Sequence, residues 1–324
     1  MSLSSYIVAT GSYLPDRILT NRELEQMVET SDEWIVQRSG IKERRIAAEG
    51  QTTSDMAVRA AQNALESAGL KASDIDCVIV ATTTPDRTFP SVAVMVQEAL
   101  DIAPGPAFDV QAVCSGFVYA LSVCDALIKA GQVKRALIIG AEKMSSVVDW
   151  NDRTTCVLFA DGAGAVILEA CARETVKNAP GIISTHLYAD GRQKDLLYTD
   201  GGPSSTGEAG HIIMHGREVF KNAVTYMAQV VEETLEFNKM KADEIDWLVP
   251  HQANIRIIES TAKKLNMPME RVIVTVERHG NTSAASIPLA FDEGVKSGRI
   301  KRGDLVLFEA LGAGLTWGAA LVRF

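Results

Sequence analysis

The chain has 324 residues, of which 47% are hydrophobic and 23% charged, enough for about two core-sized units, so it is neither a mini-protein nor a disordered tail. Its five cysteines, at unrelated spacings, form neither a disulfide framework nor a paired CxxC site, and we expect a reducing, cytoplasmic environment. The net charge of −9 and the pI near 5.2 argue against nucleic-acid binding, because phosphate binding needs a basic surface.

Segments rich in valine and isoleucine alternate with amphipathic stretches along the chain, the pattern of an α/β protein with buried sheets. The N-terminus has no basic leader, and the longest conspicuous uncharged stretch, Val110 to Cys124, is too short to cross a bilayer, so we expect neither secretion nor membrane insertion. Residues 51–69 predict a helix, with a hydroxyl cap at its start and Gly69 at its end. Residues 72–81 predict a turn and then a buried strand.

Cys114 stands in Gln111-Ala-Val-Cys-Ser-Gly-Phe117, directly before an uncharged segment that predicts a buried helix. A thiol at a helix N-terminus faces unpaired N–H groups and the positive end of the helix dipole, which lower the pKa of the thiol. We therefore expect a nucleophile here. A packed, inert cysteine is the alternative, and it is the role that we expect for Cys124 and Cys156.

Two glycine clusters, Asp161-Gly-Ala-Gly-Ala165 and Gly312-Ala-Gly314, lack the full G-x-G-x-x-G fingerprint of a dinucleotide site, and we predict tight turns at both. The second can present backbone N–H groups to an oxyanion beside Cys114. The five histidines are dispersed, and His211 with His215 lacks the glutamate of a zinc-protease helix, so we expect no metal site.

The second part of the chain repeats features of the first. Residues 242–251 resemble residues 72–81 at an offset of 170 (242 − 72), and residues 292–302 resemble residues 125–135 at an offset of 167 (292 − 125). We infer an internal duplication and expect two halves, residues 1–174 and 175–324. The stretch from 190 to 210, rich in glycine and proline, predicts a surface loop of the second half.

The two offsets also relate the reactive residues. Subtracting 167 from 281 gives 114, so we expect Asn281 at the loop-to-helix junction that matches Cys114. His251 ends a predicted buried strand, where active sites of α/β folds collect. Taken alone, His251 is equally consistent with a satisfied core histidine, and Asn281 with a helix cap. Their joint placement with Cys114 predicts a catalytic set.

Three segments carry a specific resemblance: Val113-Cys-Ser-Gly-Phe117, Val249-Pro-His-Gln-Ala-Asn254 and Arg278-His-Gly-Asn-Thr-Ser-Ala-Ala-Ser286. They resemble the active-site motifs of β-ketoacyl-acyl-carrier-protein synthase III, the family of initiating condensing enzymes of type II fatty acid synthesis. The similarity continues to the C-terminal residues 318–324. It implies a thiolase-like fold, with two βαβαβαββ halves in a five-layered αβαβα arrangement, and a homodimer.

The resemblance implies a two-step acyl transfer without a metal or redox cofactor. The Cys114 thiolate takes an acyl group from acyl-CoA, typically acetyl-CoA. Malonyl-acyl-carrier protein then loses CO2, and the carbanion attacks the acyl-cysteine to give a β-ketoacyl product. His251 and Asn281 suit the decarboxylation because each can donate an N–H to the thioester oxygen that gains charge, an effect worth roughly 3 kcal/mol per donor.

The resemblance also implies ligand contacts. Trp34, Arg38 and Arg153 match positions that hold the CoA adenine between an aromatic ring and guanidinium planes. Asn254 matches a contact to the pantetheine arm. Phe89 matches a residue that reaches into the acyl pocket across the dimer interface.

The chain departs from the family pattern in two places. Gly312-Ala-Gly314 replaces a common run of three glycines, which we expect to alter the oxyanion loop slightly. Leu311 and Leu315 stand where phenylalanines are frequent, which we expect to bear on acyl-chain preference.

Basic side chains recur at helical spacing on both sides of His251 in the sequence. Arg217 and Lys221 fall on one predicted helical face, and Arg256, Lys263 and Lys264 fall on another. Acyl carrier proteins are strongly acidic, so we expect these faces to dock one, although each residue is also compatible with an ordinary solvated side chain.

Other functions fit parts of this pattern. Papain-like proteases have the same Cys, His, Asn order, and the spacing of 137 residues (251 − 114) lies in their range, but their C-G-S-C-W flanking sequence is absent. Acyl-CoA-primed polyketide or quinolone-type synthases share the three residues. A non-catalytic acyl-thioester-binding protein with an inert thiol is the remaining alternative.

Overall fold

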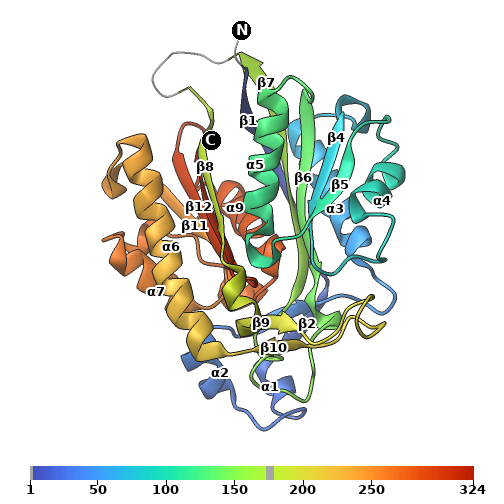
Figure 1. The fold of residues 1–324 in the computed structure, drawn as a ribbon, viewed down its shortest axis with the longest axis vertical. Coiled ribbons are helices and arrows are strands. Elements are labelled where there is room, and N and C mark those ends of the chain that lie inside the picture. The colour runs from blue at the N-terminus through green and yellow to red at the C-terminus, as the bar shows by residue number, and fades with distance from the viewer. Residues whose placement is uncertain (1–2, 173–178) are drawn as a thin grey trace.

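The computed structural model describes residues 3–172 and 179–324. They form two mixed sheets with helices between them and on both outer faces, which gives five layers in the order helix, sheet, helix, sheet, helix (Figure 1). This is the α/β, αβαβα layering that the sequence resemblance implied. Within the described ranges, no helix is long and apolar enough to cross a membrane.

The first sheet takes its strands from residues 3–172, in the order β1-β7-β6-β4-β5. Their bounds are Leu3–Tyr13 (β1), Asp161–Ala172 (β7), Arg135–Lys143 (β6), Cys77–Ala81 (β4) and Ala107–Val110 (β5). β4 is parallel to β5 and β6, whereas β7 is antiparallel to β6 and β1. β5 is therefore an edge strand.

The second sheet takes its strands from residues 181–323, in the order β11-β12-β13-β8. Their bounds are Trp247–Pro250 (β11), Leu305–Gly312 (β12), Thr316–Arg323 (β13) and Gly181–Ala189 (β8). Only β11 and β12 are parallel, as β4 and β6 are in the first sheet. Two short antiparallel pairs join Arg17–Thr20 (β2) to Glu43–Ile46 (β3) and Leu197–Thr199 (β9) to Ile212–Met214 (β10).

The α-helices are Asn21–Leu24 (α1), Asp32–Ser39 (α2), Thr53–Ala68 (α3), Val92–Ala99 (α4), Gly116–Lys129 (α5), Gly216–Asn238 (α6), Ile255–Lys264 (α7), Val276–His279 (α8) and Ser286–Lys296 (α9). Short 3-10 turns cover Ala72–Asp74 (η1), Val113–Ser115 (η2), Met144–Ser146 (η3), Gly191–Leu196 (η4), Ala242–Glu244 (η5), Met269–Arg271 (η6) and Ser283–Ala285 (η7).

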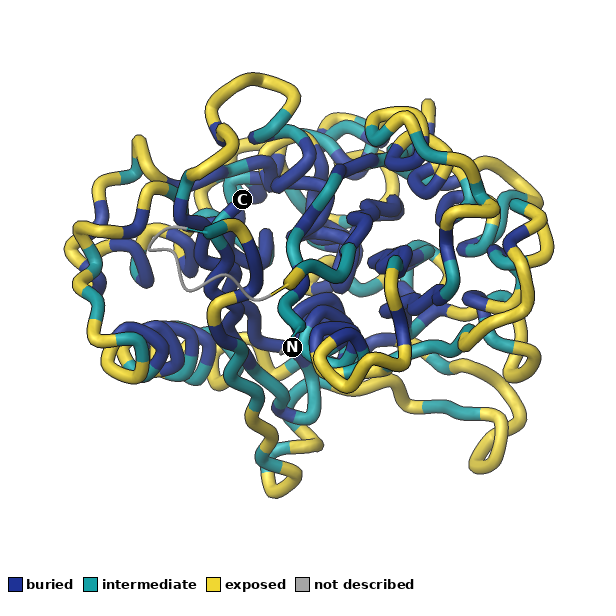
Figure 2. Tube along the Cα trace, turned by 90° about the horizontal axis from the view of Figure 1, so that it is seen from above, coloured by how far each residue is buried: buried dark blue, intermediate teal, exposed yellow. Residues whose placement is uncertain are grey.

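Helix composition decides which layer each helix occupies. α5 and α9 are largely apolar and form the middle layer, in contact with both sheets. Phe117, Phe291 and Phe308 meet there edge to face. The amphipathic helices α3 and α4 cover the outer face of the first sheet, and α6 covers that of the second. Buried residues consequently fill the interior, and exposed ones lie on the outer loops and helix faces (Figure 2).

The helix and strand predicted for residues 51–81 are confirmed. Thr52 caps α3 and, with Asp55, completes a capping box, because each side chain bonds to the backbone N–H of the other. Gly69 ends the helix in the left-handed region, at φ +64°. η1 and β4 follow as the predicted turn and strand.

The duplication is visible in the fold, but the predicted pairing of Cys114 with Asn281 is wrong. η2 and α5 match η7 and α9 at an offset of 170, so Ala284 is the counterpart of Cys114. The offset of 167 holds only where the helices end, because α9 has 11 residues and α5 has 14.

Two other sequence interpretations are corrected. Residues 161–165 are not a tight turn but the start of β7, where Gly164 passes so close to α9 that an added Cβ would lie 2.6 Å from the Leu289 nitrogen. Residues 190–210 are not wholly loop, because they include η4 and β9. The predicted turn at residues 312–314 is confirmed as the β12–β13 hairpin. The predicted boundary between residues 174 and 175 lies outside the described residues.

Candidate active site

Cys114 lies in η2, directly before α5, as predicted, and is 4% exposed. The turn is pressed against the end of β12, where a Cβ added to Gly312 would lie 2.8 Å from the Cys114 nitrogen. Val113, with φ +49°, enters the left-handed region that non-glycine residues rarely adopt. The backbone at the thiol is thus tightly constrained.

The expected lowering of the Cys114 pKa is contradicted. Burial raises the pKa of the thiol to about 12, with a further rise from Glu142, and a hydrogen bond with Ser283 only partly opposes this. Burial removes the hydration that would stabilise the thiolate. This loss is larger than the stabilisation that the helix dipole provides, so the pKa rises. Cys114 is therefore a protonated thiol before substrate binds.

His251 follows β11 directly, at the predicted strand end, and its backbone N–H donates to the Glu309 carbonyl at 2.8 Å. Its Nδ1 lies 2.6 Å from the Ser286 hydroxyl, which also accepts from the Gln252 N–H at 3.3 Å. The donor in the contact between Nδ1 and Ser286 depends on the tautomer of the ring; when the Ser286 hydroxyl donates to Nδ1, Nε2 carries the ring proton. Burial lowers the pKa of His251 to about 3, so the ring is a neutral donor.

Asn281 lies between α8 and η7, and its backbone is paired with the Phe159 segment. Its N–H donates to the Leu158 carbonyl, and its carbonyl accepts from the Ala160 N–H, both at 2.9 Å. The side-chain Oδ1 accepts from the Ser283 N–H at 2.9 Å. Asn281 is not the helix cap that the sequence also allowed, because the N-cap of η7 is Thr282 and that of α9 is Ala285. Its contact with Ser283 holds the side chain by the oxygen and leaves Nδ2 to donate.

η7 brings the three predicted residues together. Its Ser283 bonds to the Cys114 side chain and to Asn281, and Ser286, directly after it, bonds to His251. The turn fits against β6 only because residue 140 is glycine, where a Cβ would lie 2.3 Å from the Ala284 oxygen. The three residues are thus linked as the sequence predicted. The residues that link them, Ser283 and Ser286, were not predicted.

A cavity of about 390 Å³ opens beside Cys114. Its lining is mainly apolar and includes Met144, Phe159 and Ile212, with Ala313 and Gly314 from the hairpin turn. Leu197, Tyr198 and Thr199 of β9 also line it, so the stretch predicted to be a surface loop forms a wall of the site.

Leu311 and Leu315 do not line this cavity. They are buried in a cluster with Ala223 and Met227 of α6 and Ile257 of α7. The two leucines therefore make no direct contact with the cavity through which they could set acyl-chain preference.

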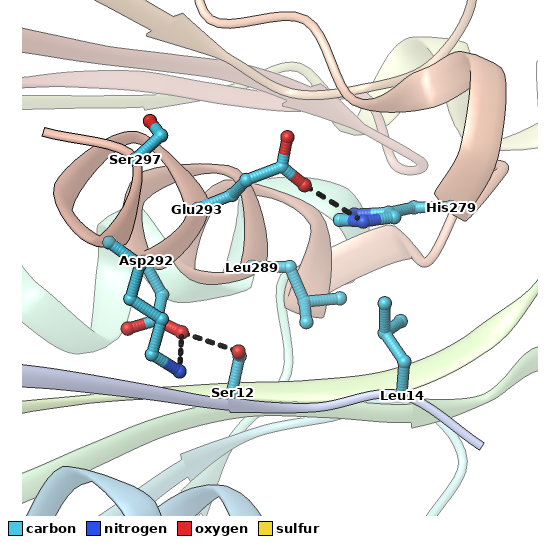
Figure 3. A pocket seen from close by; sticks show the side chains of 8 residues that line it. Ser12, Leu14, His279, Leu289, Asp292, Glu293 and Ser297 are labelled. Atoms are coloured by element: carbon cyan, nitrogen blue, oxygen red, sulfur yellow. Dashed lines mark hydrogen bonds and ion pairs between the residues drawn. The ribbon is translucent and has the colours of Figure 1, made fainter. Parts of the chain in front are cut away.

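A second cavity, of about 340 Å³, lies between β1 and α9 (Figure 3). Its charged groups are already paired: Asp292 bonds to Lys296 at 2.7 Å, and Glu293 lies 3.2 Å from His279. It contains no thiol or other nucleophile of the predicted set. Of these two cavities, only the one beside Cys114 is lined by the predicted nucleophile.

The residues expected to bind CoA surround one aromatic ring. The guanidinium carbons of Arg38 and Arg153 lie 5.7 and 5.3 Å from the centre of the Trp34 ring. Trp34 lies on α2, whose end touches α7, since a Cβ on Gly40 would lie 2.6 Å from Ile255. Asn254 caps α7 with its Oδ1, which leaves its NH2 group for a ligand. The side chain of Phe89 is 82% exposed.

The predicted docking residues are exposed on the outer face of α6 and α7. The Arg256 guanidinium lies 5.4 Å from the centre of the Phe220 ring, which joins the basic faces of the two helices. Lys264 donates to the Val224 carbonyl at 3.3 Å. In the described part of the chain, Arg217, Lys221, Arg256, Lys263 and Lys264 have no acidic side chain within ion-pair distance.

Cys124 and Cys156 are buried, as expected for packed residues. Burial raises the pKa of Cys124 and, to about 11, that of Cys156. No group of His, Cys, Asp and Glu in residues 3–172 and 179–324 is arranged to hold a metal ion.

The chain is similar to known proteins over its whole length. Models described as 3-oxoacyl-[acyl-carrier-protein] synthase III and its C-terminal part match residues 108–191 and 235–324. β-Ketoacyl-[acyl-carrier-protein] synthase III of Paramagnetospirillum magneticum is 62% identical over 323 residues, 100% of each chain.

Solved structures agree with this. 3-Oxoacyl-[acyl-carrier-protein] synthase III from Aquifex aeolicus VF5 is 50% identical, with a TM-score of 0.93 over 99% of this chain and 100% of that one. The priming β-ketosynthase of the R1128 polyketide pathway is 34% identical, with a TM-score of 0.91 over 99% of this chain and 96% of that one.

Proposed function

The chain belongs to the 3-oxoacyl-[acyl-carrier-protein] synthase III family, a family of acyl-transferring condensing enzymes of fatty acid synthesis, and we propose that Cys114, His251 and Asn281 perform its reaction. The observation that carries the proposal is the η7 turn, which binds Cys114 and Asn281 through Ser283 and is followed by Ser286 on His251. Membership of this family argues against a Cys-His-Asn hydrolase. The identity of 62% to a synthase III, against 34% to a polyketide-priming enzyme, favours fatty acid initiation.

In the first half-reaction the Cys114 thiolate attacks the carbonyl carbon of an acyl-CoA, most simply acetyl-CoA. A sulfur–carbon bond forms on Cys114, and CoA leaves as its thiolate. The acyl chain occupies the apolar cavity of about 390 Å³ beside the thiol. The hairpin turn with Ala313 and Gly314 offers backbone N–H groups to the oxyanion.

In the second half-reaction malonyl-acyl-carrier protein loses CO2, and negative charge builds on its thioester oxygen. Nε2–H of the neutral His251 and Nδ2–H of Asn281 stabilise that oxygen, since their other polar atoms are held by Ser286 and Ser283. The carbanion attacks the acyl-cysteine carbon, and the Cys114 thiolate leaves. The chemistry needs no metal or redox cofactor.

The binding sites of the two carriers follow from the outer residues. CoA stacks its adenine at Trp34, Arg38 and Arg153, and its pantetheine arm passes Asn254. The acyl-carrier protein docks on the basic faces of α6 and α7.

We further infer a homodimer. Phe89 is 82% exposed, which an aromatic side chain rarely is, and it would be covered on reaching into the partner's acyl pocket. The edge strand β5 offers backbone groups for pairing with a second copy. Cys77, Cys114, Cys124 and Cys156 form no disulfide, which suits a cytoplasmic location.

Mass spectrometry of the acyl-enzyme tests this function. Incubation with a panel of acyl-CoAs should add one acyl group to the wild type, and subsequent addition of malonyl-acyl-carrier protein should remove it and yield the β-ketoacyl product. Cys114→Ala should gain no acyl mass, whereas Cys156→Ala should be acylated normally. Acylation of the Cys114→Ala protein at one site would refute the assignment.

A further inference from the structure

The mechanism above leaves open which group takes the proton of the Cys114 thiol. Burial raises the pKa of that thiol to about 12, so few molecules hold a thiolate at neutral pH. His251 is a poor acceptor, because burial lowers the pKa of its imidazole to about 3 and Nδ1 is already bonded to Ser286. A second buried titratable group acts on the thiol.

That group is Glu142 on β6, which is 0% exposed. In the described residues, its carboxyl accepts hydrogen bonds from two segments, the turn after β4 and η7. The Thr84 hydroxyl donates at 2.6 Å, the Thr83 N–H at 3.0 Å and the Ser283 hydroxyl at 3.0 Å, with weaker bonds from Thr82 and Thr83 hydroxyls. The neighbouring Lys143 turns away and bonds to the Gln51 carbonyl at 2.7 Å. Cys114 is the titratable neighbour of this carboxyl.

Ser283 connects the carboxyl to the thiol. Its hydroxyl donates to Glu142 Oε1 and also hydrogen-bonds with the Cys114 side chain, while its backbone N–H holds Asn281 Oδ1. The residue has φ +49°, an uncommon conformation for a side chain other than glycine. This conformation allows one residue to contact the nucleophile, the carboxyl and the amide together.

We propose that Glu142 accepts the proton of the Cys114 thiol through the Ser283 hydroxyl. The S–H bond of Cys114 breaks as an O–H bond forms on Ser283, and the original Ser283 proton passes to Glu142 Oε1. The result is a thiolate beside a neutral carboxylic acid, with no change in net charge. Ser283 is thus a catalytic residue, and Glu142 acts through it.

The proton returns at the end of the cycle. CoA leaves as a thiolate and is protonated by solvent, while Glu142 stays protonated in the acyl-enzyme. When condensation releases the Cys114 thiolate, Glu142 returns the proton through Ser283. A neutral Glu142 also removes a negative charge from beside the site while the enolate forms. Burial, which raises the pKa of Glu142, favours this protonated state.

The first test separates the half-reactions. Ser283→Ala removes the hydroxyl but keeps the N–H that holds Asn281, so acetyl transfer to Cys114 should slow by about 100-fold while malonyl decarboxylation changes by less than about threefold. Thr282→Val is the matched control. The Thr282 hydroxyl, on the residue before Ser283, has no hydrogen-bond partner in the described residues, so its loss should leave both rates unchanged.

The second test uses alkylation of Cys114 by iodoacetamide as a function of pH, which requires no acyl transfer. In the wild type the internal transfer supplies thiolate at a constant level, so the rate should be flat over about two pH units above the pKa of Glu142. In Glu142→Gln the rate should rise about tenfold per pH unit throughout. Asp161→Asn is the control, since Asp161 is equally buried but bonds to Ala47 and Ser145 instead.

This inference rests on the proposed function, and the outcomes keep the two apart. Acylation of Cys114→Ala would refute the nucleophile. If Cys114 is acylated in the wild type but Ser283→Ala transfers acetyl at the wild-type rate, the relay is refuted and the proposed function stands. A wild-type alkylation rate that rises tenfold per pH unit without a flat segment would also refute the relay, even if Glu142→Gln failed to fold.

Discussion

His251 is only 2% exposed, and burial lowers the pKa of its imidazole to about 3, so the ring is uncharged at neutral pH. An uncharged ring cannot attract the enolate as an ion. In the proposed mechanism it contributes as a fixed donor, with Nδ1 held by Ser286 and Nε2–H donating to the thioester oxygen. Asn281 is held in the same way through its oxygen. This geometry supports the proposal that both residues stabilise an oxyanion rather than exchange protons.

We therefore expect His251→Ala and Asn281→Ala to separate the half-reactions. Each change removes one oxyanion donor, so malonyl decarboxylation and condensation should fall by about 100-fold or more, while acetyl transfer to Cys114 largely survives. Radiolabelled acetyl-CoA and malonyl-acyl-carrier protein measure the two steps. Equal loss of both steps in both variants would mean that the pair acts on the thiol instead.

Glu309 gives a prediction about stability. Its carboxyl is 0% exposed and lacks a hydrogen-bond partner in the described residues, and burial raises its pKa to about 8. In the unfolded chain the group ionises near pH 4.3. Between these values the unfolded state binds fewer protons, so the free energy of unfolding falls as pH rises, by up to about 1.4 kcal/mol per pH unit.

Glu309→Gln removes this titration. The free energy of unfolding, measured with urea at several pH values between 5 and 8, should fall less per pH unit in the variant than in the wild type. The difference in slope should be at most about 1.4 kcal/mol per pH unit. Identical pH slopes in the two proteins would mean that Glu309 ionises without cost in the folded state.

The sequence predicted the reactive residues of the site but not the residues that hold them. Cys114, His251 and Asn281 stand in motifs that mark loop ends next to helices and strands. Glu142 and Ser283 are 141 positions apart, and their contact depends on how two duplicated halves pack. The thiol pKa was misjudged for the same reason, because desolvation is a property of the packed layers.

At the scale of elements, helix ends that depend only on residues close in sequence could be predicted. The cap at Thr52 and the glycine at 69 define α3 within the chain itself. The glycines at 162 and 164 do not form the predicted turn, because their small size serves the close packing of β7 against α9. β9 was missed because its partner β10 begins only at residue 212, beyond the glycine-rich stretch.

Close packing at β6 gives an element-scale prediction. Gly140→Ala would place a Cβ 2.3 Å from the Ala284 oxygen and force η7 away from the sheet. Since η7 contacts Cys114, His251 and Asn281 through its own or adjoining residues, both half-reactions should fall by at least about tenfold. Gly191→Ala, where the added Cβ meets nothing within 4 Å, should retain wild-type rates. Wild-type activity of Gly140→Ala would show that η7 can shift without loss.

At the scale of the whole molecule, the charge distribution matters more than the total. The chain carries a net charge of −9, which would repel an acidic partner at long range. α6 and α7 nevertheless present Arg217, Lys221 and Arg256 on the outer layer of the second half, on helices that frame the strand leading to His251. α3 lies on the opposite outer layer and therefore serves as a control surface for charge reversals on α6 and α7.

Docking on this face predicts a specific kinetic effect. Arg256→Glu or Lys221→Glu should raise the KM for malonyl-acyl-carrier protein by about tenfold and leave acetyl transfer from CoA unchanged, because the reversed charge repels the acidic carrier without reaching the thiol. Wild-type activity with the carrier-bound substrate should also fall with salt more steeply than acetyl transfer does, since exposed charges are screened beyond about 10 Å at 0.1 M salt. Arg59→Glu, an equally exposed reversal on α3, should leave the KM unchanged. If Arg59→Glu and Arg256→Glu have the same effect, only the net charge matters and the carrier does not dock on α6 and α7.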